Sequence, residues 1–85
     1  MGQYEVRFLP SVRKDLRRIP MATVRRLLRA IDALTEDPRP PGCVRLSGTD
    51  LYRVRVGASR VLYEIRYAAV VVIVVKIGHR REVYR

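Results

Sequence analysis

The chain has 85 residues, 48% of them hydrophobic, and its 18 basic and 8 acidic residues give a net charge of +10. This length allows one domain with one core over residues 1–85, and the apolar content excludes a disordered chain. Sixteen of the basic residues are arginines, whose planar, permanently charged side chains suit bidentate phosphate contacts, so the charge predicts a polyanionic partner such as RNA, DNA or an acidic protein.

The first elements expected are a strand and a short helix. Apolar and polar residues alternate over residues 4–9, which is typical of a strand, and Pro10 ends it. Ser11 is placed to cap a helix over residues 12–19. The apolar residues of this helix fall on one stripe, Val12, Leu16 and Ile19.

A second, longer helix follows at Pro20, which suits a first helical turn. Residues 21–36 place six apolar side chains at helical spacing: Met21, Val24, Leu27, Leu28, Ile31 and Leu34. The proline-rich segment 37–42 stops this helix, and residues 43–50 are expected to form a loop. The two helices therefore form an antiparallel hairpin with one apolar side each.

The rest of the chain predicts three strands. Residues 51–57 and 60–67 alternate between apolar and polar, and residues 70–77 are apolar on both faces, which indicates a central strand. The predicted fold is α+β in the order β-α-α-β-β-β. It consists of an antiparallel-rich four-stranded sheet with a two-helix hairpin packed on one face.

A two-residue turn at Ala58 and Ser59 would set which side chains of the hairpin share a face. It pairs Gly57 with Arg60, Arg55 with Leu62, and Arg53 with Glu64. Directly opposed residues share a face, so Arg53, Arg55 and Arg60 are predicted to lie together on the side of the sheet without helices. A three-residue turn would instead bury the Arg60 guanidinium in the apolar face at a large desolvation cost.

Residues 76–85 concentrate groups that bind phosphate or move protons: Lys76, His79, Arg80, Arg81 and Tyr84. This tail leaves the central strand beside the hairpin, so it is expected to flank the arginine face, with Arg80 rather than Arg81 facing the cleft. RNA carries its own nucleophile, the 2′-hydroxyl, so a cleft of this kind needs to align it, remove its proton and stabilise the phosphorane. The side chains expected to bind RNA are Arg53, Arg55, Lys76 and Arg81. The alternative for Arg53 and Arg55 is that they form only the solvent face of an edge strand, with Arg53 paired to Glu64.

The sequence offers little for a metal or a membrane. One histidine, one cysteine (Cys43) and scattered acids make no ligand cluster, so no metal and no other cofactor is expected. A single cysteine excludes an internal disulfide and suits a reducing compartment. The apolar run 70–75 is too short to span a bilayer, so a cytoplasmic protein without a membrane partner is expected.

Five segments carry a family resemblance through their order and spacing, although each alone is a weak signal. They are residues 4–8, 46–48, 52–55, 60–63 and the closing motif 78–84. Together they resemble the RelE side of the RelE/ParE toxin superfamily of bacterial and archaeal toxin–antitoxin systems, over nearly the whole chain. The resemblance implies a ribosome-dependent, metal-independent endoribonuclease that cuts mRNA in the A site and leaves a 2′,3′-cyclic phosphate and a 5′-hydroxyl. It also implies a cognate antitoxin that wraps around the toxin in a hetero-oligomer.

The resemblance further implies roles for individual side chains. Arg60 matches the phosphate-contacting arginine of the family, and Arg80 matches the arginine near the leaving group. Tyr84 matches the tyrosine assigned to general base or base stacking. Arg53 and Arg55 match a basic pair that the best-known members fill with lysines.

Two departures leave the proton acceptor open. An arginine effectively never loses its proton, so Arg53 and Arg55 can hold charge but are poor bases. His79 stands where many members carry a lysine, and imidazole groups exchange protons near neutral pH, so His79 or Tyr84 is expected to act as base. The expected catalytic set is Arg55, Arg60, His79, Arg80 and Tyr84.

Three other functions remain open. A ParE-type inhibitor of DNA gyrase would share the fold without cleaving RNA, although the matches at Arg60, Arg80 and Tyr84 favour phosphoryl-transfer chemistry. A non-catalytic RNA-binding domain, or a degenerate toxin that only binds its antitoxin, would keep the basic face without the reaction. The third alternative is cleavage of free RNA without a ribosome.

Overall fold

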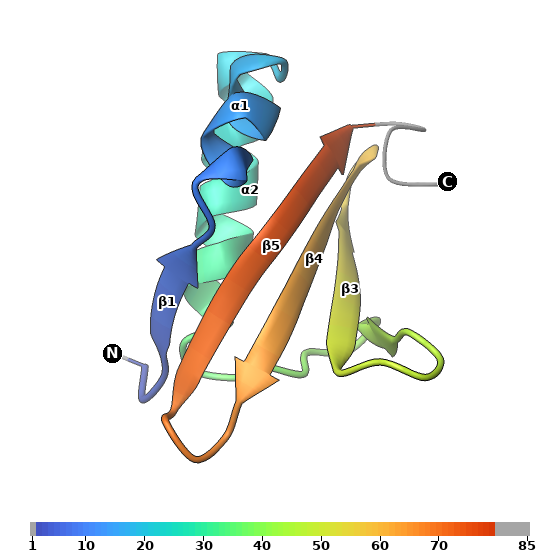
Figure 1. The fold of residues 1–85 in the computed structure, drawn as a ribbon. Helices are drawn as coiled ribbons and strands as arrows, with labels where there is room; N and C mark the ends of the chain where they lie inside the picture. Colours follow the sequence, from blue (N-terminus) through green and yellow to red (C-terminus); the bar gives the residue numbers. More distant parts are fainter. Residues whose placement is uncertain (1, 80–85) are drawn as a thin grey trace.

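Two helices cover one face of a five-stranded sheet in the computed structural model, which describes residues 2–79 (Figure 1). The elements in chain order are β1 (Glu5–Phe8), α1 (Ser11–Arg17), α2 (Met21–Ala33), β2 (Val44–Arg45), β3 (Leu51–Val56), β4 (Ser59–Arg66) and β5 (Val71–His79). The α+β class and the two-helix layer are confirmed. The strand count is corrected from four to five, because two residues of the expected loop 43–50 pair with β3 as β2.

Strand β5 occupies the interior of the sheet, as its apolar sequence predicted. The strand order is β1-β5-β4-β3-β2, with β1 parallel to β5 and every other pair antiparallel. Since β5 pairs on both sides and carries helices on one face, a continuous apolar run suits it better than alternation. Along the part of the chain that is described, neither helix is long and apolar enough to cross a membrane.

The hairpin of β3 and β4 turns at Gly57 and Ala58, not at Ala58 and Ser59 as expected. Val56 pairs with Ser59, and Arg55 lies directly opposite Arg60. Gly57 has a φ of +61°, a conformation that a two-residue hairpin turn requires and that glycine adopts without strain. Each pairing partner is shifted by two residues from the predicted one, and an even shift leaves every side chain on its predicted face.

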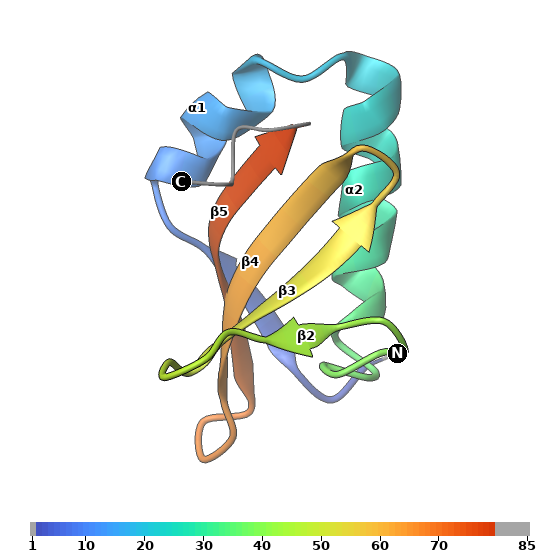
Figure 2. The same cartoon turned by 90° about the vertical axis from the view of Figure 1, so that its right-hand side faces the viewer.

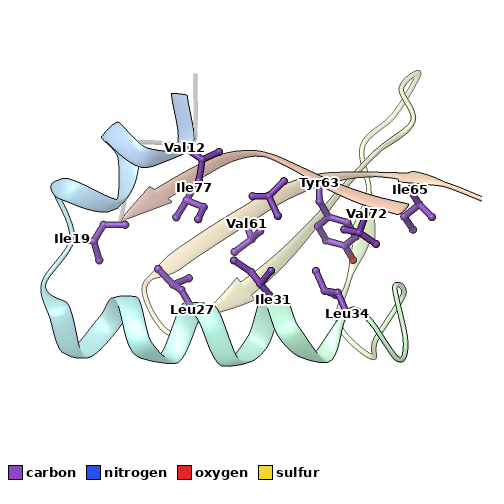
Figure 3. Packing of buried hydrophobic residues seen from close by; sticks show 11 residues of the cluster. Val12, Ile19, Leu27, Ile31, Leu34, Val61, Tyr63, Ile65, Val72 and Ile77 are labelled. Carbon is purple, nitrogen blue, oxygen red and sulfur yellow. The ribbon is translucent and has the colours of Figure 1, made fainter. Parts of the chain in front are cut away.

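The core lies between α2 and the sheet (Figure 3). Its fully buried side chains come from both layers: Val12, Leu27, Ile31, Leu34, Val61, Tyr63, Val72, Val74 and Ile77. Met21 and Leu28 of the predicted apolar stripe are exposed instead, since they lie at the margins of the α2 stripe. The predicted cap at Ser11 is wrong. Ser11 is the first residue of α1, Pro10 occupies the N-cap position, and no side chain caps this helix.

Tyr63 fixes the segment that follows α2. Its ring is fully buried, and its hydroxyl donates a hydrogen bond of 2.7 Å to the backbone carbonyl of Pro38. Burial raises the pKa of this phenol well above its ordinary range, so the hydroxyl stays protonated and remains a donor. The segment after α2 is therefore anchored to the middle of β4.

Candidate functional site

The face of the sheet that carries no helix presents a cluster of arginines near the turn of the β3–β4 hairpin. Figure 2 shows the sheet with the two helices behind it. Arg53, Arg55 and Arg60 share this near face, because they alternate with core-facing residues of β3 and β4. We refer to these three residues as the arginine face. Their predicted grouping is confirmed.

Arg55 and Arg60 form the central pair of this face. They are direct cross-strand neighbours, a spacing that brings their Cβ atoms to within about 5.5 Å and makes two like charges repel. Arg55 is exposed and Arg60 is half-buried. On its other side Arg60 pairs with Gly78 of β5, which has no side chain to fill the space. Two cationic side chains therefore start from directly opposed positions on this face, an arrangement suited to a bridging anion.

His79 does not join the arginine face. It pairs with Ser59, and both share the helix-covered face with Val61 and Ile77. The Nδ1 atom of His79 lies 2.8 Å from the Oγ atom of Ser59, a hydroxyl that is fully shielded from solvent. The expectation that the tail places His79 on the same side of the sheet as the arginine face is therefore wrong. A bulge in the β4–β5 pairing, between Leu62 and Tyr63, reverses the alternation of β5.

Lys76 is engaged in the fold. Its Nζ atom lies 2.9 Å from Oδ1 of Asp15 in α1, and Oδ2 of the same carboxylate accepts a hydrogen bond of 3.0 Å from the backbone N–H of Ile77. Strand β1 ends at Phe8, opposite Val74, so Asp15 takes over the edge of β5 where β1 stops. The contact of Lys76 with RNA stays a prediction.

Two polar partners were missed by sequence reasoning, Asp15 and Ser59. Asp15 lies three residues after Val12 and four before Ile19, so it falls within the apolar stripe of α1, and that position could have marked it as a buried acid. Ser59 was assigned to the turn. No local pattern distinguishes it from a turn serine, because its burial depends on the register.

The remaining site residues of the prediction, Arg80, Arg81 and Tyr84, lie outside the described residues, and their roles stay predictions. Within residues 2–79, no group of three or more His, Cys, Asp and Glu side chains is arranged to hold a metal ion. The described part of the site thus consists of the three-residue arginine face and the Ser59–His79 contact at the end of β5.

Comparison with known families decides the identity of this fold. The family model described as ParE toxin of type II toxin–antitoxin system, parDE, matches residues 6–84. The chain belongs to the RelE/ParE toxin family. This toxin is also similar to toxin RelE1 of Methanocaldococcus jannaschii, with 31% identity over 87 aligned positions that cover 98% of this chain and 97% of that protein.

Solved structures agree with this membership. The RelE–RelB complex of Pyrococcus horikoshii OT3 contains a chain that is 34% identical to this toxin, with a TM-score of 0.83 and coverage of 94% of this chain and 98% of that one. The toxin–antitoxin complex RelBE2 of Mycobacterium tuberculosis gives 25% identity, a TM-score of 0.80 and coverage of 92% and 99%. The toxin is thus a RelE-family toxin of a type II toxin–antitoxin system.

Proposed function

We propose that this toxin cleaves messenger RNA in the A site of the ribosome and that a cognate antitoxin restrains it in a hetero-oligomer. The observation that carries the proposal is the opposed pair Arg55 and Arg60 on the helix-free face, with Arg53 two residues along β3 on the same face. The similarity to proteins named RelE supports a RelE-type activity.

The proposed chemistry starts from the two like charges of Arg55 and Arg60. Their repulsion is relieved when a phosphate bridges them, so the pair favours an anion. As the ribose 2′-oxygen attacks the adjacent phosphorus, negative charge grows on the non-bridging oxygens, and both guanidinium groups can donate hydrogen bonds there. The bond from phosphorus to the 5′-oxygen then breaks, which leaves a 2′,3′-cyclic phosphate and a 5′-hydroxyl.

Two proton transfers complete the step. The 2′-hydroxyl loses its proton to a base, and the departing 5′-oxygen takes one from water, while the charge of Arg80 stabilises this leaving group in the proposal. Because the guanidinium groups supply the positive charge, the step requires no metal ion. Neither Arg55 nor Arg60 can take the proton, since a guanidinium does not lose its own.

We assign proton abstraction to Tyr84 rather than to His79, because His79 lies on the face opposite Arg60. Replacing Tyr84 by phenylalanine removes only the hydroxyl and is expected to lower single-turnover cleavage by about 10²–10⁴-fold. Replacing His79 by alanine is expected to change the rate by less than about tenfold. Rate profiles against pH check both variants. A profile that loses its rising, low-pH limb in His79→Ala and keeps it in Tyr84→Phe would return the role to His79, because a base works only after it has lost its own proton.

An apolar groove supports the antitoxin part of the proposal. It has a volume of about 620 Å³ and is lined by Phe8, Leu9, Pro10, Val12, Arg13, Leu16 and Leu28. Phe8, Leu9 and Leu28 are exposed there, and Arg13 brings positive charge beside them. The relatives from Pyrococcus and Mycobacterium are both solved as complexes with a partner protein. An amphipathic, acidic antitoxin segment fits this groove by apolar contact and by charge.

Mapping RNA ends after brief induction tests the cleavage. Primer extension is expected to show new 5′ ends only inside translated codons, and the cuts are expected to disappear from a reporter mRNA whose start codon is removed. Cuts that persist in the untranslated reporter would show that free RNA is the substrate. Intact mRNA together with growth arrest would overturn the proposal.

A second candidate is ParE-type inhibition of DNA gyrase, which the description of the matching family model favours. Inhibition of gyrase does not need a phosphate-binding pair of arginines on the helix-free face. In the same induced cells, gyrase inhibition would give intact mRNA and a DNA-damage response, so one experiment separates the two functions.

A further inference from the structure

A hollow lined by basic and aromatic residues lies toward the other end of the sheet from the arginine face. It has a volume of about 510 Å³ and is lined by Arg39, Arg45, Asp50, Tyr52, Ile65 and Tyr67. Tyr52 and Ile65 share the helix-covered face with the core, whereas Arg55 and Arg60 are on the opposite face. Along β4, Ile65 of the hollow lies about 17 Å from Arg60, since each strand residue adds about 3.3 Å. It is therefore separate from the proposed cleavage site.

Aromatic rings support the hollow from the core outward. The buried Tyr63 holds the carbonyl of Pro38, and the ring of Tyr52 stacks on Tyr63 with 5.9 Å between centroids and 23° between planes. Tyr67 continues to the surface, where 51% of it is exposed. A hydrogen bond with Tyr52 raises the pKa of the Tyr67 hydroxyl, so this ring is neutral at physiological pH. The inner rings are therefore packed against the core, and the outermost ring is accessible.

Two arginines bring positive charge to this ring. The guanidinium carbon of Arg39 lies 6.0 Å from the centroid of Tyr67, a cation–π distance. Arg45 is held by a hydrogen bond of 3.0 Å from its Nε atom to the carbonyl of Thr49 and by an ion pair of 3.6 Å with Asp50. Asp50 is the one acid among the lining residues, so two positive charges face one negative charge.

We propose that this hollow is a second RNA-contact site that takes one unpaired nucleotide, with its base against the Tyr67 ring and its phosphate at Arg39 and Arg45. An exposed aromatic ring beside arginines is the arrangement by which proteins hold single-stranded nucleic acid without reading its sequence. An acidic peptide would use the two charges and leave the ring without a role. The site rests on the proposed action on RNA and adds a contact outside the cleavage site.

Oligonucleotide binding tests the site directly. The full chain carrying Arg60→Ala, which suppresses cleavage, is titrated against a labelled twelve-residue oligouridylate and followed by fluorescence anisotropy. Adding Tyr67→Ala is expected to weaken binding by about 5- to 150-fold, the range of one base–aromatic stack. Tyr67→Phe is expected to bind like its parent. Arg25→Gln, which removes an exposed charge from α2, is expected to have a much smaller effect than Arg39→Gln.

A matched oligomer without bases separates stacking from charge. Tyr67→Ala is expected to bind this abasic oligomer as its parent does, whereas Arg39→Gln is expected to bind it more weakly. Equal binding of oligouridylate by Tyr67→Ala and its parent would overturn the proposal. The proposal would also be overturned if Tyr67→Ala lost binding only to a polyglutamate peptide, because the hollow would then be a protein-binding site.

Ribosomes distinguish the two sources of the nucleotide. If it comes from mRNA, Tyr67→Ala is expected to weaken binding only to ribosomes programmed with mRNA; if it comes from ribosomal RNA, binding to empty ribosomes weakens as well. The two proposals can fail separately. A wild-type chain that cuts no mRNA, with a Tyr67 variant that still loses oligouridylate, would overturn the cleavage and leave the second site. Normal cleavage with unchanged oligonucleotide binding would do the reverse.

Discussion

Replacing Arg60 by alanine is expected to lower the rate of mRNA cleavage by about 10²–10³-fold, the usual loss when one preorganised donor to a developing oxyanion is removed. Arg60 is the half-buried member of the opposed pair with Arg55, and Gly78 leaves space at its other side. The Nε atom of Arg60 is also shielded from solvent, so part of the side chain is packed before RNA arrives. Single-turnover cleavage of mRNA on programmed ribosomes measures the loss.

The matched control is Arg66→Ala. Arg66 lies on the same strand and the same face as Arg60, about 20 Å away, where it forms an ion pair of 2.7 Å with Glu64. Both variants remove one positive charge from the helix-free face, but only Arg60 has Arg55 opposite it. Cleavage by Arg66→Ala is therefore expected to stay close to wild type. The cleavage rate of Arg60→Lys is expected to lie between those of wild type and Arg60→Ala, because lysine keeps the charge but lacks the planar guanidinium.

Salt dependence separates a role in the reaction from a role in attracting RNA. Electrostatic attraction is screened over about 8 Å at physiological ionic strength, whereas hydrogen bonds inside a closed complex are not. The loss of cleavage in Arg60→Ala is expected to appear in the rate at saturating ribosome concentration, and this loss is expected to persist at high salt. Equal losses in Arg60→Ala and Arg66→Ala, both vanishing at high salt, would show that the arginine face only attracts RNA.

The arginine face was predictable because it depends only on the alternation of side chains between the two faces of the sheet. The alternation in residues 51–57 and 60–67 separates polar from apolar side chains, and this separation survives any even shift of register. The turn itself was placed one residue late, although Gly57 was available to adopt the positive φ that the turn needs. Strand β2 was not predictable, since two residues in a proline- and glycine-rich segment carry no alternation.

The position of His79 depended on a feature that leaves no trace in an apolar run. In β5 both faces are apolar, so a bulge that moves later residues to the other face changes no hydrophobic pattern. Beyond the bulge, Ile77 enters the core and His79 meets Ser59. The tertiary partner of Asp15 was equally hidden, because the edge that Asp15 covers exists only where β1 stops short of the end of β5.

Asp15→Ala is expected to lower the free energy of unfolding by about 2–3 kcal/mol, because it leaves the buried N–H of Ile77 without its charged acceptor. Asp15 is 9% exposed, so water cannot replace the carboxylate without opening the contact between α1 and β5. Lys76→Ala breaks the same ion pair but is expected to cost less than about 1 kcal/mol, because the Lys76 side chain is 46% exposed. Urea unfolding at neutral pH measures both variants.

The exposed Asp32 of α2 provides the control, since Asp32→Ala removes the same charge and is expected to change stability by no more than about 0.5 kcal/mol. A double-mutant cycle of Asp15 and Lys76 isolates the ion pair, and its coupling is expected to be small beside the loss in Asp15→Ala alone. If Lys76→Ala cost as much as Asp15→Ala, the ion pair rather than the edge of β5 would be what Asp15 stabilises. Because Ile77 directly precedes Gly78, the neighbour of Arg60, loosening this edge is also expected to reduce cleavage under conditions where the variant remains folded.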